Sequence, residues 1–288
     1  MFSKIVLILF SLLVMSLAEP TPTLKIISFN IRYDNPGDAE HRWDNRKERV
    51  VNLLKFYQAD VFGLQEALHH QVTYVEEAFP YYRRVGVGRD DGETKGEYSP
   101  IFYDTTQLQS IDEGTFWLST TPDEPSKDWD AALPRIATWV SLRDKSTKNT
   151  ILVCNSHFDH RGKVARLESA KLLQEKLPML ANGKPIVLMG DFNSAPNSAP
   201  YQVLNSGETL KDAYIKSNLS PVGPEQSFSG FVVTPDLPGE RIDHIFVSPS
   251  LKVLRYAIIS EEKNGAYPSD HFPVFAEISN LDDEDVDR

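Results

Sequence analysis

The chain has 288 residues, a formal net charge of −11 and one cysteine, Cys154. A single cysteine excludes an intrachain disulfide, and the acidic balance argues against tight binding of duplex nucleic acid, which proteins usually contact with a basic face. The charge does not exclude hydrolysis of phosphate esters, because a divalent metal can supply positive charge locally.

The N-terminal residues 1–18 have the pattern of a secretory signal peptide. Lys4 is the only charge in this nearly all-apolar stretch, and small residues precede Glu19. The stretch is too short for the roughly 20 apolar residues that a bilayer-spanning helix needs, and no later transmembrane segment is expected. We therefore expect a secreted protein with one domain over residues 19–280 and an acidic, disordered tail over residues 281–288.

The apolar pattern begins with a strand, a helix and a second strand. Residues 24–30 form an apolar run typical of a buried strand, and an apolar stripe at helical spacing extends from Val50 to Tyr57. A second buried strand is expected over residues 61–66. This order predicts a β-α-β unit at the start of the domain.

The rest of the chain continues to mix strands with helices. Apolar residues at helical spacing predict a second helix over residues 165–177, which Pro178 is expected to end. Glycine- and proline-rich stretches predict long surface loops, which often carry functional residues when a rigid sheet positions them. The expected loops lie near residues 86–100, 119–135 and 221–240, and the further expected strands cover residues 100–103, 151–155, 186–189, 242–247, 253–259 and 274–278.

Asp191 and Asn193 directly follow the apolar run over residues 186–190. Residues two apart on extended backbone point to the same side, so this carboxylate and this amide can reach one small volume at the strand end. Such a pair suits holding a metal ion or a water molecule against a phosphate. The alternative is a polar turn that closes the strand, with Asn193 bonding to its own backbone.

Polar side chains also stand at the ends of the other expected strands. In isolation, each is an ordinary turn former or a solvated group. Six such endings in one chain, all carrying Asn, Asp, Glu or His, favour a shared site. Besides Asp191 and Asn193, they carry Asn30, Glu66, His157, Asp243 and the pair Asp270 and His271.

The chemistry that these residues suit is phosphoryl transfer. Mg²⁺ takes oxygen ligands, usually one or two carboxylates with water and substrate phosphate, and Glu66 and Asp270 can supply the carboxylates. His157 and His271 can stabilise the phosphate, and a neighbouring carboxylate such as Asp243 can fix and charge an imidazole. The sequence has no His-Glu-x-x-His helix and no cysteine cluster, so a zinc site is not expected.

Six short motifs at these strand ends carry a family resemblance. They are Ser28–Ile31, Leu64–Glu66, Asn155–His157, Gly190–Asn193, Ile242–Ile245 and Ser269–Pro273. Together they resemble the endonuclease/exonuclease/phosphatase superfamily, which includes pancreatic-type deoxyribonucleases, inositol phosphate 5-phosphatases and neutral sphingomyelinases. The resemblance implies an α+β fold, a four-layer α/β sandwich of two packed mixed β-sheets flanked by helices, with the site at the sheet ends.

The resemblance also implies which residues hold the metal. Glu66 is the principal metal ligand, Asp270 supports the metal end, and Asn30 contacts metal or phosphate. Mg²⁺ is the implied cofactor, with Mn²⁺ as the alternative. The number of metal ions, one or two, is left open.

The same resemblance implies how water and phosphate are handled. His157 binds the scissile phosphate, and Asp191 orients or deprotonates the attacking water with Asn193 beside it. Asp243 pairs with His271, which stabilises the transition state. The identity of the general base among the carboxylates is left open.

Further residues are candidates for substrate binding. Arg32, Arg46 and Arg161 can clamp a phosphate through the planar guanidinium, and surface ion pairs are the equally supported alternative. His160 stands beside Arg161 as an additional candidate. Tyr98 precedes an expected strand, which places it either near the site or in a structural position.

We therefore expect a secreted, Mg²⁺-dependent hydrolase of small or short phosphate esters. A phosphodiesterase is favoured over a phosphomonoesterase acting on a sugar, inositol or lipid phosphate. A secreted nuclease is a further alternative, which the acidic charge does not favour. An inactive binding protein on the same fold is the least favoured, because all the polar strand ends are present.

Overall fold

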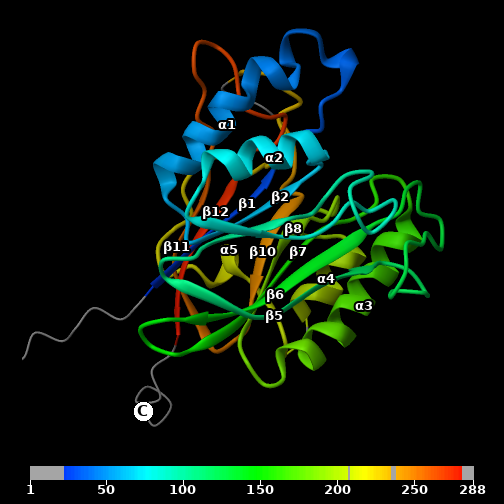
Figure 1. Cartoon of the computed structure of the whole chain (residues 1–288), viewed down its shortest axis with the longest axis vertical. Coiled ribbons are helices and arrows are strands. Elements are labelled where there is room, and N and C mark those ends of the chain that lie inside the picture. The colour runs from blue at the N-terminus through cyan, green and yellow to red at the C-terminus, as the bar shows by residue number, and fades with distance from the viewer. Residues whose placement is uncertain (1–22, 207, 235–237, 281–288) are drawn as a thin grey trace, which may run out of the picture.

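The computed structural model describes residues 23–206, 208–234 and 238–280, so the expected signal peptide and acidic tail lie outside the described residues. Two sheets of six strands each lie face to face, with helices on both outer faces (Figure 1). None of the described helices is long and apolar enough to cross a membrane.

The first sheet contains β1 (Thr23–Asn30), β2 (Val61–Gln65), β3 (Tyr82–Val85), β4 (Ile101–Asp104), β11 (Leu251–Ile258) and β12 (Val274–Asn280). Its strand order is β11-β12-β1-β2-β4-β3. β1 and β2 pair in parallel, with Ile26 opposite Val61 and Asn30 opposite Gln65. Helix α1 (Trp43–Tyr57) connects these two strands, so the predicted β-α-β unit is confirmed.

The second sheet contains β5 (Leu108–Trp117), β6 (Ile136–Asp144), β7 (Thr150–His157), β8 (Ile186–Asp191), β9 (Lys211–Asp212) and β10 (Asp243–Val247). Its strand order is β5-β6-β7-β8-β10-β9. β7 and β8 run parallel and end together, with His157 opposite Asp191. β10 runs antiparallel to β8, so its first residue, Asp243, also lies opposite Asp191.

Apolar side chains on both faces of each sheet explain the four layers. Between the sheets lies a core cluster with Ile26 of β1 and Val187 of β8. Helices α1 and α2 (His69–Ala78) cover the outer face of the first sheet, where Leu54 and Phe62 belong to one apolar core cluster. Helices α3 (Lys163–Ala181) and α4 (Ala199–Ser206) cover the second sheet. The predicted four-layer sandwich is confirmed. The short helical segments are η1 (Pro36–His41) and α5 (Ala213–Lys216).

Helix α3 continues through Pro178 to Ala181, so the prediction that Pro178 ends this helix was wrong. Proline removes one N–H from a helix, but its carbonyl still accepts a hydrogen bond. Asn182, with left-handed backbone at φ 46°, donates its backbone N–H to the Pro178 carbonyl at 3.1 Å. Ala181 is buried against the outer core of the second sheet, and this packing stabilises the additional turn.

Candidate active site

The polar strand ends meet at one edge of the two packed sheets. Asn30 ends β1 and Glu66 follows β2, whereas His157 and Asp191 end β7 and β8. The approach of β7 to β8 requires a glycine before Asp191, because a Cβ at Gly190 would lie 2.0 Å from the Ser156 carbonyl oxygen. Asp243 begins β10, and Asp270 and His271 lie just before β12, so these three residues reach the same edge from two antiparallel strands.

Asn30 links the acidic residues of the two sheets. Its Nδ2 donates to Glu66 Oε1 at 3.2 Å and to Asp191 Oδ2 at 2.9 Å. Its Oδ1 accepts the backbone N–H of Arg32 at 3.0 Å. A backbone N–H can only donate, so this contact fixes the amide orientation. Asn30 was predicted as a metal ligand, and in this arrangement it holds two carboxylates through its nitrogen.

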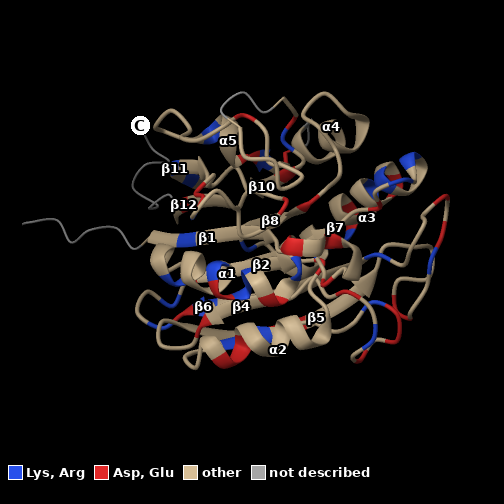
Figure 2. Cartoon of the chain, turned by 90° about the horizontal axis from the view of Figure 1, so that it is seen from above, with Lys and Arg blue, Asp and Glu red and all other residues tan. Residues whose placement is uncertain are grey.

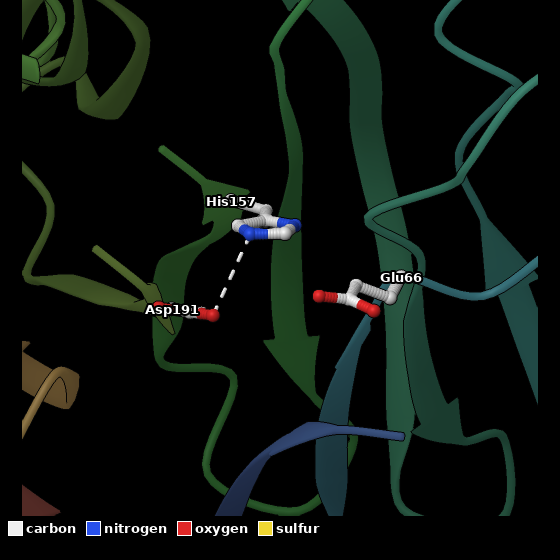
Figure 3. Close-up of side chains that lie close together, drawn as sticks. All are labelled: Glu66, His157 and Asp191. Carbon is white, nitrogen blue, oxygen red and sulfur yellow. Dashed lines mark ion pairs between the residues drawn. The ribbon is translucent and has the colours of Figure 1, made fainter. Parts of the chain in front are cut away.

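His157, Asp191 and Asn193 form a compact group. Asn193 Nδ2 lies 3.1 Å from His157 Nε2, and the Asn193 backbone N–H donates to Asp191 Oδ1 at 2.9 Å. His157 Nε2 also lies 3.5 Å from Asp191 Oδ2, the contact that is dashed in Figure 3. Burial and the nearby Arg135 guanidinium lower the pKa of His157 well below its ordinary value, so the imidazole is neutral. The expectation that Asp191 and Asn193 reach one small volume agrees with this geometry.

His271 is cationic, whereas His157 is neutral. Its Nδ1 lies 2.9 Å from Asp243 Oδ2, which also accepts the Ser227 hydroxyl at 2.7 Å. Burial alone would lower the pKa of His271, but the carboxylates of Asp243 and Asp191 outweigh it and raise the pKa well above its ordinary value. The predicted pair of Asp243 and His271 is therefore present in the structure as a buried ion pair.

Asp191 lies between these two histidines, and its pKa is raised. Burial, together with the charge of Asp243, raises the pKa of Asp191 to about 7. A carboxylate with a pKa near neutrality is suited to accept a proton from water. A neutral histidine on one side and a cationic histidine on the other give the site distinct acid, base and charge-stabilising groups.

Glu66 and Asp270 provide the donor chemistry for a hard divalent cation. Glu66 has left-handed backbone at φ 61° and accepts the Tyr33 backbone N–H at 3.2 Å. Burial and the charge of Glu66 raise the pKa of Asp270, although His271 opposes this shift. The carboxylate oxygens of these two acids are the ligand type that a bound Mg²⁺ or Mn²⁺ takes. His157 and Asp191 offer further ligand atoms near Glu66, within 4.8 Å of one another.

Two of the predicted substrate-binding arginines make extensive contacts within the protein. Arg32 directs Nε and Nη2 toward the Asp38 carboxylate, at 2.9 and 3.0 Å. Arg46 is only 1 % exposed. Its guanidinium donates to the backbone carbonyls of residues 31, 32, 33, 41 and 268. A guanidinium has five N–H donors, and these contacts engage all of its nitrogens. The geometry therefore gives Arg46 a structural role instead of the predicted contact with substrate.

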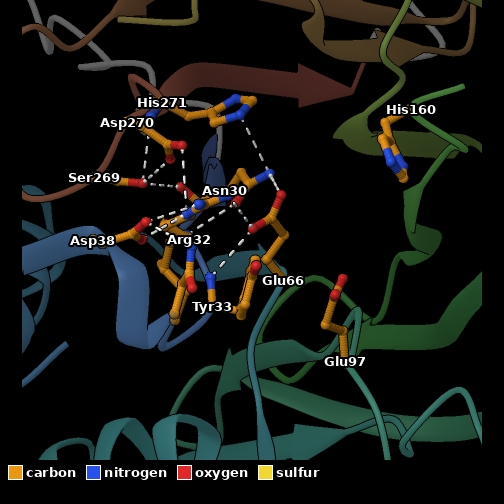
Figure 4. Close-up of polar contacts among 12 residues, drawn as sticks. Asn30, Arg32, Tyr33, Asp38, Glu66, Glu97, His160, Ser269, Asp270 and His271 are labelled. Carbon is orange, nitrogen blue, oxygen red and sulfur yellow. Dashed lines mark hydrogen bonds and ion pairs between the residues drawn. The ribbon is translucent and has the colours of Figure 1, made fainter. Parts of the chain in front are cut away.

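The other three candidates lie in different environments. Tyr98 is 2 % exposed in the outer core, and its hydroxyl contacts His69 Nδ1 at 2.9 Å, which supports the structural alternative. His160 lies on the far side of the site from Asp270 (Figure 4), where its Nδ1 contacts Arg135 Nη2 at 2.9 Å. Arg161 is exposed.

Glu97 is a site residue that the sequence analysis did not identify. Its carboxylate makes two hydrogen bonds with Arg89, at 2.7 and 2.9 Å, and lies 3.8 Å from His157 Nδ1. Glu97 stands in an irregular segment where no strand end marks it. The only signal was its place beside Tyr98 before an expected strand, and that signal indicates neither burial nor orientation.

A four-layer sandwich with paired acids and histidines at one sheet edge defines a class of phosphoester hydrolases. The chain belongs to the Endonuclease/Exonuclease/phosphatase family, whose family model matches residues 27–271. Members of this family hydrolyse phosphate esters and depend on divalent metals.

Solved structures and curated proteins include clear relatives of this chain. A mannosyl-6-phosphatase of Bacteroides thetaiotaomicron is 41% identical, with a TM-score of 0.84, over 88% of this chain and 99% of that one. An endonuclease/exonuclease/phosphatase family protein of the same species is 39% identical, with a TM-score of 0.87, over 91% and 100% of the two chains. The CCR4-Not complex 3'-5'-exoribonuclease subunit Ccr4 of Mycosarcoma maydis is 23% identical over 89% of this chain, which spans 50% of that relative's length.

Proposed function

We propose that this protein is a secreted, divalent-metal-dependent phosphatase that removes a terminal phosphate from small sugar phosphates. The observation that carries the reaction type is the arrangement around Asp191. Its pKa is about 7, and it lies between a neutral His157 and a cationic His271. Mg²⁺ is the proposed metal, with Mn²⁺ as the alternative, and Glu66 and Asp270 are its proposed carboxylate ligands.

The side chains of the site divide the proposed reaction between them. Asp191 accepts a proton from the attacking water, and Asn30 holds its carboxylate in place through a 2.9 Å hydrogen bond. The cationic His271 stabilises negative charge on the phosphoryl oxygens. Asn193 fixes the His157 ring against the same phosphate. The bound metal supplies further positive charge for the phosphate and lowers the pKa of a coordinated water.

The low exposure of the site residues supports a terminal phosphate over an internal phosphodiester. His157, Asp270 and His271 are 6 %, 7 % and 5 % exposed. A phosphate at the end of a small molecule can reach such groups, whereas an internal phosphate brings two bulky substituents with it. The similarity to a mannosyl-6-phosphatase supports a sugar phosphate in particular. In Figure 2, basic and acidic residues are intermixed over the described elements, which does not favour a long polyanion.

A phosphodiesterase, the class favoured from the sequence, is the second candidate, because one relative is an exoribonuclease subunit. A single attack by water on phosphorus serves both substrate classes. The choice between them therefore depends on the surroundings of the site and not on Asp191 or Glu66.

Phosphate release from defined substrates tests the proposal. The purified protein is incubated with mannose 6-phosphate, glucose 6-phosphate, p-nitrophenyl phosphate and bis-(p-nitrophenyl) phosphate, in Mg²⁺, in Mn²⁺ or in EDTA. We expect the sugar phosphates to be hydrolysed best, and only with metal. Glu66→Gln should lower turnover at least about 100-fold while the protein stays folded. Preference for the diester would support the second candidate, and no turnover of any phosphate ester would contradict both.

A further inference from the structure

Arg32 stands at the acidic edge of the site on a rigid backbone. Its φ is 56°, in the left-handed region. The Asn30 side chain accepts its N–H, and Gln71 Nε2 donates to its carbonyl at 3.0 Å. Its guanidinium carbon lies 4.6 Å from the centre of the Tyr33 ring. A strained backbone held from both sides indicates that the position of this cation matters.

The guanidinium faces the two carboxylates that fit the metal. Nη1 lies 3.8 Å from Glu66 Oε2, and Nε lies 3.8 Å from Asp270 Oδ2. Both distances are too long for hydrogen bonds but short for charges on partly buried side chains, which solvent screens less than exposed ones. Arg32 therefore lowers the negative potential at both carboxylates without using up their oxygens.

Asp38 keeps this cation in its place. It accepts both N–H groups on one edge of the guanidinium, at 2.9 and 3.0 Å, and Asn35 donates to Asp38 Oδ1 at 2.7 Å. Figure 4 shows Arg32 between Asp38 on one side and Glu66 on the other. Asp38 occupies the Nε/Nη2 edge of the guanidinium, and no hydrogen bond joins Arg32 to Glu66 or Asp270, so Arg32 acts on these two carboxylates mainly through its charge.

We propose that Arg32 is a built-in counter-cation that weakens the divalent-metal affinity of the Glu66 and Asp270 centre, and that Asp38 holds Arg32 there while cancelling part of its charge. The inference rests on the metal centre of the proposed function. In the metal-free protein, Arg32 offsets the repulsion between the two acids. When a metal ion binds, the same cation opposes it, so the centre binds metal less tightly than its carboxylates alone allow.

Metal titration of three variants at Arg32 and Asp38, with Glu66→Gln as the test of the metal centre, tests this inference. Mn²⁺ binding to the full chain is measured by calorimetry at one fixed pH and salt concentration. Arg32→Gln should lower the Kd for Mn²⁺ about tenfold, because a neighbouring positive charge is lost. Arg32→Lys keeps the charge and should stay within about threefold of the unaltered protein. Asp38→Asn exposes the full charge of Arg32 and should raise the Kd.

Thermal unfolding in EDTA supplies a readout that does not depend on turnover. Arg32→Gln should lower the Tm of the metal-free protein, because Glu66 and Asp270 then repel each other without compensation. Mn²⁺ should raise the Tm of this variant by more than it raises the Tm of the unaltered protein.

The direction of each change separates the inference from a purely structural role. If Arg32 only supports the loop, Arg32→Gln and Asp38→Asn should both weaken Mn²⁺ binding, and that result overturns the inference. If Arg32→Gln does not fold, the second neutral variant Arg32→Met takes its place, and an unchanged or higher Kd for Mn²⁺ overturns the inference. Glu66→Gln tests the metal centre itself: unchanged Mn²⁺ affinity would refute the centre, whereas lost affinity without tightening in Arg32→Gln would refute only the role of Arg32.

Discussion

At the scale of single residues, Asp243 sets the charge of His271. The Asp243 carboxylate lies 2.9 Å from His271 Nδ1 and, with Asp191, keeps the imidazole protonated. Asp243→Asn keeps a hydrogen-bond acceptor but removes the negative charge. We expect the pKa of His271 to fall and kcat to fall at least about 100-fold, because the cation that stabilises the phosphoryl oxygens is lost. Histidine titration by NMR and steady-state kinetics measure the two effects.

Ser227→Ala is the matched control for Asp243→Asn. It removes the 2.7 Å hydrogen bond to the same carboxylate oxygen but leaves the charge of Asp243 in place. Its effect on kcat should stay below about tenfold. Equal losses in the two variants would indicate that orientation, and not charge, is the contribution of Asp243.

The positions of some site residues could be predicted because the neighbouring sequence shows where a strand ends. Asp191 follows a buried apolar strand, so its place at the strand end follows from the alternation of side chains. Arg46 could not be predicted as buried, since Asn45 and Lys47 beside it suggest an exposed helix face. Its burial depends on carbonyls as distant in sequence as Pro268. Glu97 likewise acquires its role through contact with Arg89 and His157, which no local pattern encodes.

At the scale of elements, Arg46 fastens the loop after β1 to helix α1. Its guanidinium donates to carbonyls of residues 31, 32 and 33 in that loop and to residues 41 and 268. Arg46→Met fills similar space but leaves buried carbonyls without donors. Each unsatisfied buried group costs about 1–3 kcal/mol, so we expect the free energy of unfolding to drop by at least about 3 kcal/mol. Urea unfolding measures the change.

The exposed Arg143 of β6 provides the comparison for Arg46. Arg143→Met removes the same charge from the surface and should change the free energy of unfolding by less than about 0.5 kcal/mol. Arg46→Lys keeps the charge but loses the planar fork, and should fall between the two. A small effect of Arg46→Met would show that water can satisfy the carbonyls and that Arg46 does not hold the loop.

A strand or helix can be predicted from sequence when its local pattern of apolar residues matches the burial of its side chains. β8 is buried along its whole length, so its unbroken apolar run predicts a strand. β5 was not predicted, because a shift in register between Ser110 and Asp112 interrupts the two-residue period and most of its residues are partly or fully exposed. Pro178 misled the prediction of α3, because the packing of Ala181 is a tertiary contact.

At the scale of the whole molecule, two sheets meet so that acids from both gather at one seam. Glu66 and Asp270 lie beside strand ends of the first sheet, and Asp191 and Asp243 come from the second. Collecting buried carboxylates in this way opposes folding once they ionise. These carboxylates therefore lower the stability of the metal-free protein, but the same charges can hold a metal and, through it, a phosphate.

The effect of Asp191 on stability can be measured through its pH dependence. Its pKa in the folded protein is about 7, because burial and Asp243 disfavour its charge, and in the unfolded chain it returns to about 3.9. Between these values the folded state binds more protons than the unfolded state. The contribution of Asp191 is therefore fully present below about pH 4 and is lost as the pH rises through about 7. Asp191→Asn, which cannot ionise, should lack this loss.

Urea unfolding in EDTA at about pH 5 and about pH 8 tests that prediction. The free energy of unfolding of Asp191→Asn, relative to the unaltered protein, should be higher at pH 8 than at pH 5, because only the unaltered protein must keep a buried charge at the higher pH. Asp112→Asn, at an exposed position of β5, should show no such difference. Parallel pH profiles for Asp191→Asn and the unaltered protein would contradict the raised pKa. They would also remove the main reason for assigning Asp191 as the proton acceptor.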